Sequence, residues 1–156
     1  MRKIAVFASG TGTNFDAIQK AIEDKYLDAV IECVVVDKKN ALVIEKAKKK
    51  NIYVFDFNPK DYESKAAYEK EIVELLDSKE IELVCLAGYM RLVGETLLSA
   101  YEGRIINIHP SLLPAFVGKD AIGQAIRYGV KVMGVTIHYV DSGMDSGKII
   151  AQRSFD

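Results

Sequence analysis

Strand-like apolar runs alternate with amphipathic segments along most of this chain, and this alternation restricts its fold more than any other feature. The apolar runs are short and bounded by turn residues, and they lie at residues 3–9, 30–37, 52–57, 81–87 and 104–109. Helical periodicity fills the segments between them. Strands separated by helices form a mainly parallel sheet with helices on both faces. The sequence therefore predicts an α/β fold with a doubly wound, Rossmann-like, mostly parallel sheet.

Helices are expected after residue 12 and at residues 40–51, 62–78, 95–101 and 119–129, with Gly129 as the C-cap of the last. The final section differs, because its apolar runs flank the segment DSGMDSG with no helical pattern between them. These runs, at residues 130–140 and 148–155, predict a C-terminal antiparallel hairpin at one side of the sheet. The chain shows no internal repeat or linker, so residues 1–156 are expected to form a single domain.

Charge and hydropathy exclude several classes of protein. The chain has 21 basic and 22 acidic side chains, a net charge of -1, which does not favour nucleic acid or an anionic membrane as a partner. No apolar run approaches the roughly 20 residues of a membrane span, and the N-terminus lacks the long apolar core of a signal peptide. Cys33 and Cys85 lie in apolar runs and are expected to be reduced. A cytoplasmic protein is predicted, with no signal for its oligomeric state.

Four polar or glycine-rich segments follow predicted strands, and these are the candidate binding loops: SGTGTN, GYMRLV, NIHPS and DSGMDSG. Ligands of open α/β sheets bind beyond the carboxyl ends of the strands. The first segment leads from a strand into a helix, where backbone N–H groups and the helix dipole suit a phosphate. We expect such a phosphate at Gly12, Thr13 and Asn14. A plain turn with Thr13 or Asn14 capping the helix is the structural alternative.

A dinucleotide site is a second alternative for this turn. Gly10 and Gly12 fit the G-x-G-x-x-G/A pattern, and Asp37 follows the second strand, where a ribose-binding acid would stand. Phe15, however, occupies the third position, where close helix–strand packing requires a small residue. The pattern therefore favours a single phosphate over a dinucleotide.

Asn107 and His109 are two residues apart at the end of a predicted buried strand, so their side chains leave the same face. Buried polar groups are costly unless they are hydrogen-bonded or used in function. An amide and an imidazole together can stabilise an oxyanion, whereas His109 taken alone is more typical of a structural histidine.

The DSGMDSG loop returns Asp141 and Asp145 to the same end of the sheet, where a carboxylate can orient an imidazole or accept a proton. The loop lacks the ligand spacing of an EF-hand, which argues against calcium. A zinc site built from His109, His138 and Asp145 has no tight ligand motif to support it. His138 is expected to be a neighbour of the site, with a purely structural role as the alternative.

Five segments together resemble the formyltransferase family: ASGTGTNF, LAGYMRLV, NIHPSLLPAF, GVTIHYVDSGMDSG and IIAQ. They span essentially the whole chain in the family's order. The run Asn-x-His-Pro-Ser-Leu-Leu-Pro with a downstream Asp is typical of formyl transfer. The glycine-rich loop that ends in Asn14 resembles the branch of the family that uses glycinamide ribonucleotide. The resemblance also implies a cis bond between Leu113 and Pro114.

The resemblance implies a reaction of de novo purine biosynthesis, in which the amine of glycinamide ribonucleotide attacks the formyl carbon of 10-formyltetrahydrofolate. The implied catalytic residues are Asn107, His109 and Asp145. Asn107 and His109 would stabilise the oxyanion, and Asp145 would keep His109 charged and help move a proton through water. No metal is implied.

The resemblance also implies the binding residues. The ribonucleotide phosphate would bind at Gly12, Thr13 and Asn14. The folate ring would be enclosed by Met90, Arg91, Leu92 and Val93, and by the loop residues Asp141, Ser142, Gly143 and Met144.

Three rival functions remain open. A methionyl-tRNA formyltransferase normally carries an RNA-binding domain, and a formyltetrahydrofolate hydrolase carries a regulatory domain; neither is found in this sequence. A non-catalytic nucleotide-binding Rossmann module would bind NADH without folate. Members of the family continue beyond the IIAQ strand with a segment that contacts the ribonucleotide. The C-terminal end of the family domain is therefore expected to be missing from these 156 residues.

Overall fold

The computed structural model describes residues 1–155, which form one seven-stranded sheet in the order β3-β2-β1-β4-β5-β6-β7. The first five strands are parallel, and β6 and β7 are antiparallel additions. The strands are β1 (Arg2–Ala8), β2 (Ala29–Val36), β3 (Tyr53–Asp56), β4 (Leu83–Leu86), β5 (Ile105–His109), β6 (Met133–Tyr139) and β7 (Ile149–Phe155). The predicted α/β fold with its C-terminal hairpin is confirmed.

The predicted helices are all present, with some bounds shifted. They are α1 (Thr13–Glu23), α2 (Leu42–Lys49), α3 (Lys65–Ser78), α4 (Glu95–Ala100) and α5 (Ala121–Tyr128). The third begins later than the predicted residue 62, because the Ser64 hydroxyl accepts a hydrogen bond from Ala67 N at 3.1 Å and caps it there. A 3₁₀ turn, Pro59–Asp61, precedes it. Gly129 ends α5 in the left-handed conformation, as predicted.

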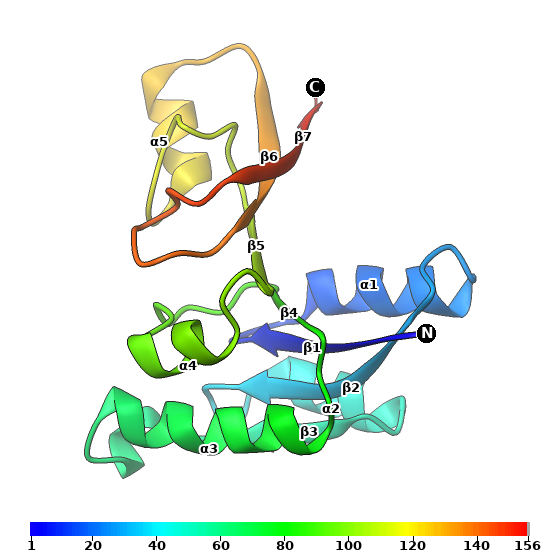
Figure 1. The fold of residues 1–156 in the computed structure, drawn as a ribbon. Coiled ribbons are helices and arrows are strands. Elements are labelled where there is room, and N and C mark those ends of the chain that lie inside the picture. The colour runs from blue at the N-terminus through cyan, green and yellow to red at the C-terminus, as the bar shows by residue number, and fades with distance from the viewer. Residues whose placement is uncertain (156) are drawn as a thin grey trace.

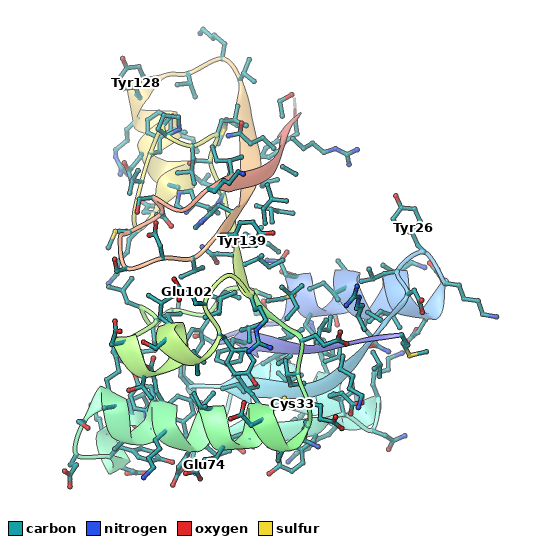
Figure 2. The ribbon with its side chains drawn as sticks, in the orientation of Figure 1. Tyr26, Cys33, Glu74, Glu102, Tyr128 and Tyr139 are labelled. Atoms are coloured by element: carbon teal, nitrogen blue, oxygen red, sulfur yellow. The ribbon has the colours of Figure 1, made fainter. Side chains whose placement is uncertain are left out.

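Two apolar clusters lie on opposite faces of the sheet, which explains why the strands read as continuous apolar runs. Val6 faces the cluster that contains α1 and α2, and its neighbour Phe7 faces the cluster that contains α3 and α4. Side chains fill the space between α3 and the sheet, where Cys33 lies, whereas the exposed Tyr26 and Tyr128 project outward (Figure 2).

The two cysteines are free and buried in different clusters, so the sheet separates them and the expectation of reduced thiols is confirmed. Burial raises the pKa of Cys33 to about 12 and that of Cys85 to about 11, which keeps both thiols protonated and unreactive near neutral pH.

The strands that follow β1 are added first on one side of it, as β2 and β3, and then on its other side, beginning with β4. The switch point between β1 and β4 sets the location of the candidate site. Strand order runs outward from β1 through β2 to β3, and from β1 through β4 to β5 on the other side. The β6–β7 hairpin and α5 stand at one end of the sheet, away from α2 and α3 (Figure 1). No helix among residues 1–155 has the length and hydrophobicity needed to cross a membrane.

Candidate active site

The turn between β1 and α1 has the geometry of an anion site. Gly12 is the N-cap of α1, with φ of 78°, and no side chain caps the helix. The first backbone N–H groups of a helix have no partner within it, so those after Gly12 are available to an anion. A Cβ at Gly12 would lie 2.6 Å from Val43 Cγ2 of α2, so only glycine fits here. The alternative in which Thr13 or Asn14 caps the helix is therefore wrong.

The dinucleotide alternative does not fit this turn. Phe15, at the position that requires a small residue, is 1% exposed and belongs to the core beneath α1 and α2. The Asp37 side chain is 1% exposed and accepts a hydrogen bond from Arg91 Nε at 3.1 Å, so its carboxylate does not face a ribose site. A single phosphate matches the geometry better than a dinucleotide does.

Antiparallel pairing of β5 with β6 places Asn107 opposite His138, and the loop after β6 brings Asp145 to both histidines. Asp145 Oδ2 lies 3.5 Å from His109 Nδ1, and Asp145 Oδ1 lies 3.6 Å from His138 Nε2. Asn107 Nδ2 lies 3.3 Å from the same His138 Nε2. The side chains of His109, His138 and Asp145 are 5%, 3% and 12% exposed, so this cluster is largely desolvated.

Both ring nitrogens of His109 face acceptors. His109 Nε2 donates to the Phe116 carbonyl at 2.9 Å, and Nδ1 faces the Asp145 carboxylate. A neutral imidazole has one N–H donor, so it would turn a lone pair toward one of these oxygens, whereas an imidazolium has a donor for each. His109 thus lies between a carbonyl oxygen and a carboxylate, each facing one of its ring nitrogens.

His138 also contacts several members of the cluster. Its Nδ1 lies 2.9 Å from the Tyr139 carbonyl oxygen, and its Nε2 lies 3.3 Å from Asn107 Nδ2 and 3.6 Å from Asp145 Oδ1. The ring therefore joins the Asn107 amide and the Asp145 carboxylate. His138 thus belongs to the cluster, as the sequence predicts for a neighbour of the site.

Sequence reasoning missed the groups that hold Asp145 and the loop after β5. Asp145 has φ of 54°, and its Oδ2 accepts a hydrogen bond from Gly118 N at 2.9 Å. Thr136 is fully buried and its hydroxyl donates to Ser111 O at 2.7 Å, which ties the loop after β5 to β6. The alternation of Thr136 with His138 was a usable signal, whereas nothing in the sequence indicated Gly118. The Leu113–Pro114 bond is cis, as the resemblance implies.

The two segments expected to enclose the folate ring are both partly exposed. Met90 and Leu92 follow β4 and are 63% and 60% exposed, and Met144 is 51% exposed. Asp141 Oδ1 accepts hydrogen bonds from Gly143 N and the Ser146 hydroxyl, both at 2.9 Å, so this carboxylate stabilises its own loop. No hydrogen bond or ion pair within residues 1–155 joins residues 90–93 to residues 141–144.

Residues 1–155 contain no group of three or more histidine, cysteine, aspartate or glutamate side chains arranged to hold a metal ion. The zinc and calcium alternatives therefore have no support in the geometry of the described side chains. What the cluster offers is a buried imidazole, a carboxylate and an amide, which are groups for proton transfer and hydrogen bonding.

The doubly wound sheet, the uncapped start of α1 at Gly12 and the imidazole–carboxylate cluster define a Rossmann-like α/β protein with side chains suited to acid–base chemistry. The sequence pattern described as "Formyl transferase" matches residues 2–156, and the chain belongs to this family.

Individual relatives share most of the chain. Phosphoribosylglycinamide formyltransferase of Bacillus subtilis is 58% identical over 156 residues, which are 100% of this chain and 80% of that protein. The human trifunctional purine biosynthetic protein adenosine-3 is 36% identical over 97% of this chain, which corresponds to 15% of its own length. The crystal structure of glycinamide ribonucleotide transformylase 1 from Geobacillus kaustophilus is 60% identical, with a TM-score of 0.96 over 99% of this chain and 82% of that one.

Proposed function

We propose that this chain transfers a formyl group from 10-formyltetrahydrofolate to the amino group of glycinamide ribonucleotide, a step of de novo purine biosynthesis. The names of the relatives support formyl transfer to glycinamide ribonucleotide, and the folate donor is inferred from membership of the family. The observation that carries the proposal is the buried approach of Asp145 to His109 at 3.5 Å, because it supplies a cationic imidazole at the edge of the sheet where ligands bind. Residues 1–156 act as one formyltransferase catalytic domain, and a cytoplasmic location stays a prediction.

His109 and Asn107 stabilise the oxyanion in this proposal. Attack of the amine on the formyl carbon places negative charge on the formyl oxygen, and N–H donors aimed at that oxygen lower the barrier. His109 Nε2 donates to the Phe116 carbonyl in this structure, and the oxyanion would replace that carbonyl as the acceptor. Asn107 Nδ2 lies 3.3 Å from His138 Nε2, and this contact holds the amide on the strand face that it shares with His109.

Asp145 stabilises the imidazolium and takes part in moving the proton that the attacking amine loses. One carboxylate oxygen faces His109, and the other faces His138. A hydrogen bond from Gly118 N fixes the carboxylate in that bridging position. The reaction needs no metal in this scheme, because the imidazolium supplies the positive charge and two bound substrates gain from proximity.

The substrates occupy two subsites at the switch point between β1 and β4. The ribonucleotide phosphate accepts hydrogen bonds from the backbone of Gly12, Thr13 and Asn14 at the start of α1. The folate ring packs on the exposed apolar side chains after β4 and on the loop after β6. These walls are Met90, Arg91, Leu92 and Val93, with Asp141, Ser142, Gly143 and Met144 opposite.

One assay tests the proposal against its rivals. The purified chain is mixed with 10-formyltetrahydrofolate and one of three acceptors, which are glycinamide ribonucleotide, water alone and initiator tRNA. We expect tetrahydrofolate release only with the ribonucleotide. Release with water alone would identify a formyltetrahydrofolate hydrolase. Formylation of the tRNA would identify a methionyl-tRNA formyltransferase. Binding of NADH without any release would favour the non-catalytic alternative.

Replacing Gly12 by valine should raise the KM for the ribonucleotide about ten-fold or more, while the KM for the formyl donor stays within about two-fold. The added side chain forces a strained φ and meets Val43, so the backbone N–H groups turn away from the phosphate. Steady-state kinetics with each substrate varied in turn measures both constants. Equal increases in the two KM values would show that the turn is structural and does not bind phosphate.

A further inference from the structure

The loop from Gly88 to Gly94, which joins β4 to α4, is held by four side chains from three other parts of the chain, which are the ends of β1 and β2 and the helix α3. Ser9 Oγ accepts from Met90 N at 2.8 Å, and Lys65 Nζ donates to Leu92 O at 2.8 Å. The remaining two contacts come from buried carboxylates. They are Asp37 Oδ2 with Arg91 Nε at 3.1 Å, and Glu69 Oε2 with Gly94 N at 2.7 Å.

The two carboxylates differ in the number of their oxygens that accept a hydrogen bond. Glu69 is 2% exposed, and its oxygens accept from the N–H groups of Gly94 and Leu97 at the start of α4, so its role is to cap that helix. The Asp37 side chain is 1% exposed and only its Oδ2 is bonded. Asp37 Oδ1 is the one buried side-chain oxygen or nitrogen within residues 1–155 that lacks a hydrogen-bond partner.

An under-satisfied buried carboxylate is a poor stabilising element. Burying a charge with an unpartnered oxygen costs free energy, and the Arg91 side chain that pairs with it is 45% exposed, which weakens the attraction between them. An apolar residue after β2 would serve the core at lower cost. The contact that Asp37 does make is therefore the feature that needs a functional explanation.

That contact fixes the course of the loop across the sheet. Asp37 directly follows β2, and Arg91 lies beyond β4, with β1 between these two strands in the sheet. The Arg91 side chain therefore reaches back over the end of β1, while its neighbours Met90 and Leu92 remain more than half exposed. Pulling Arg91 inward in this way presents its two apolar neighbours to the side where a ligand would dock.

We infer that Asp37 is a positioning residue for the formyl donor: by holding Arg91 Nε it fixes the Gly88–Gly94 loop in the conformation that binds the folate ring. This inference rests on the proposed function, in which residues 90–93 form a wall of the donor subsite. It assigns Asp37 no contact with either substrate. Replacing Asp37 should therefore weaken binding of the donor and leave the rate of the chemical step unchanged.

The Asp37→Asn substitution keeps the size of the side chain and removes the charge that holds Arg91. We expect the KM for 10-formyltetrahydrofolate to rise about five- to ten-fold, with kcat and the KM for the ribonucleotide within about two-fold of wild type. Equilibrium titration with tetrahydrofolate should show the same loss of affinity without turnover. Asp24→Asn is the matched control, because Asp24 forms an exposed ion pair with Lys20 on α1, and it should change none of these constants.

A second variant keeps the test decisive if Asp37→Asn fails to fold. Arg91→Gln changes a partly exposed side chain and removes the same contact from the other side, so it should raise the donor KM at least as much, because Arg91 is itself part of the donor wall. The double variant should be no worse than Arg91→Gln alone, because the contact between Asp37 and Arg91 is already lost in that variant. Independent, multiplying effects would mean that the two residues do not act through their contact.

The inference is overturned if Asp37→Asn lowers the melting temperature while both KM values stay at wild-type levels, since Asp37 would then be structural. It is equally overturned if the ribonucleotide KM rises as much as the donor KM. Failure of the proposed function looks different, because the wild-type chain itself would then transfer no formyl group to the ribonucleotide.

Discussion

Replacing His109 by alanine should lower kcat for formyl transfer by about 10²–10³-fold and leave the affinity for the folate donor within a few-fold of wild type. The reason lies in the position of the ring, which is buried with Nε2 2.9 Å from the Phe116 carbonyl oxygen and Nδ1 3.5 Å from the Asp145 carboxylate. An oxyanion that forms at Nε2 gains this donor only in the transition state, so its loss falls on kcat. Single-turnover measurements with both substrates saturating give the rate of the chemical step directly.

The Asp145→Asn variant should show a similar loss, because the amide cannot stabilise the imidazolium and presents an N–H group to one of the histidines. The double variant with His109→Ala should be little worse than either single variant, since the two side chains act as one unit. Folate titration of all three variants provides the binding control. Near-normal turnover of His109→Ala would show that the histidine is a structural residue of the core and would falsify the proposed mechanism.

Replacing Gly147 by alanine should lower kcat about 100-fold although this residue touches no substrate in the proposed site. A Cβ at Gly147 would clash with the Tyr139 carbonyl oxygen, so the end of the β6–β7 hairpin has to open. The same carbonyl accepts the hydrogen bond of His138 Nδ1, and the loop it closes carries Asp145. One methyl group therefore displaces two members of the cluster at once. Steady-state kinetics and thermal unfolding measure the effects on rate and stability.

Gly103→Ala is the control for this variant. Gly103 has φ of 74° in the turn after α4, but a Cβ there meets nothing within 4 Å, so the substitution introduces backbone strain without a clash. It should lower the free energy of unfolding by roughly 1 kcal/mol and leave kcat unchanged. If Gly103→Ala and Gly147→Ala reduced kcat equally, the effect would be a general loss of stability, and the special role of the hairpin end would be refuted.

The order of elements was predictable because each depends on local periodicity. Strands buried on both faces are apolar throughout, helices repeat every 3.6 residues, and Gly129 marks the end of α5. Bounds were less predictable, since the start of α3 depends on the single hydrogen bond from Ala67 N to the Ser64 hydroxyl. The pattern of glycine and proline could not reveal that Asp145 adopts a positive φ, because this conformation is imposed by the hairpin around it.

Much of the candidate site could also be predicted, because Asn107 and His109 share one strand face and the topology returns Asp145 to the same edge. What could not be predicted was the partner of each group. Asn107 contacts His138, and the Phe116 carbonyl oxygen accepts the hydrogen bond from His109 Nε2 that the proposed oxyanion would accept. Such pairings depend on the register of β5 against β6 and on loop backbone, which sequence spacing does not specify.

The sequence alone determined the fold class, the glycine turn at Gly12 and the identities of the polar residues at the sheet edge, because periodicity and the conformational freedom of glycine are local properties. Only the tertiary structure decided that Asp145 bridges both histidines and that Asp37 reaches Arg91 across the end of β1. These contacts join residues that are 36, 7 and 54 positions apart, as 145−109, 145−138 and 91−37 give. Whether such residues come into contact is decided by strand order and loop closure, which depend on the packing of the whole sheet.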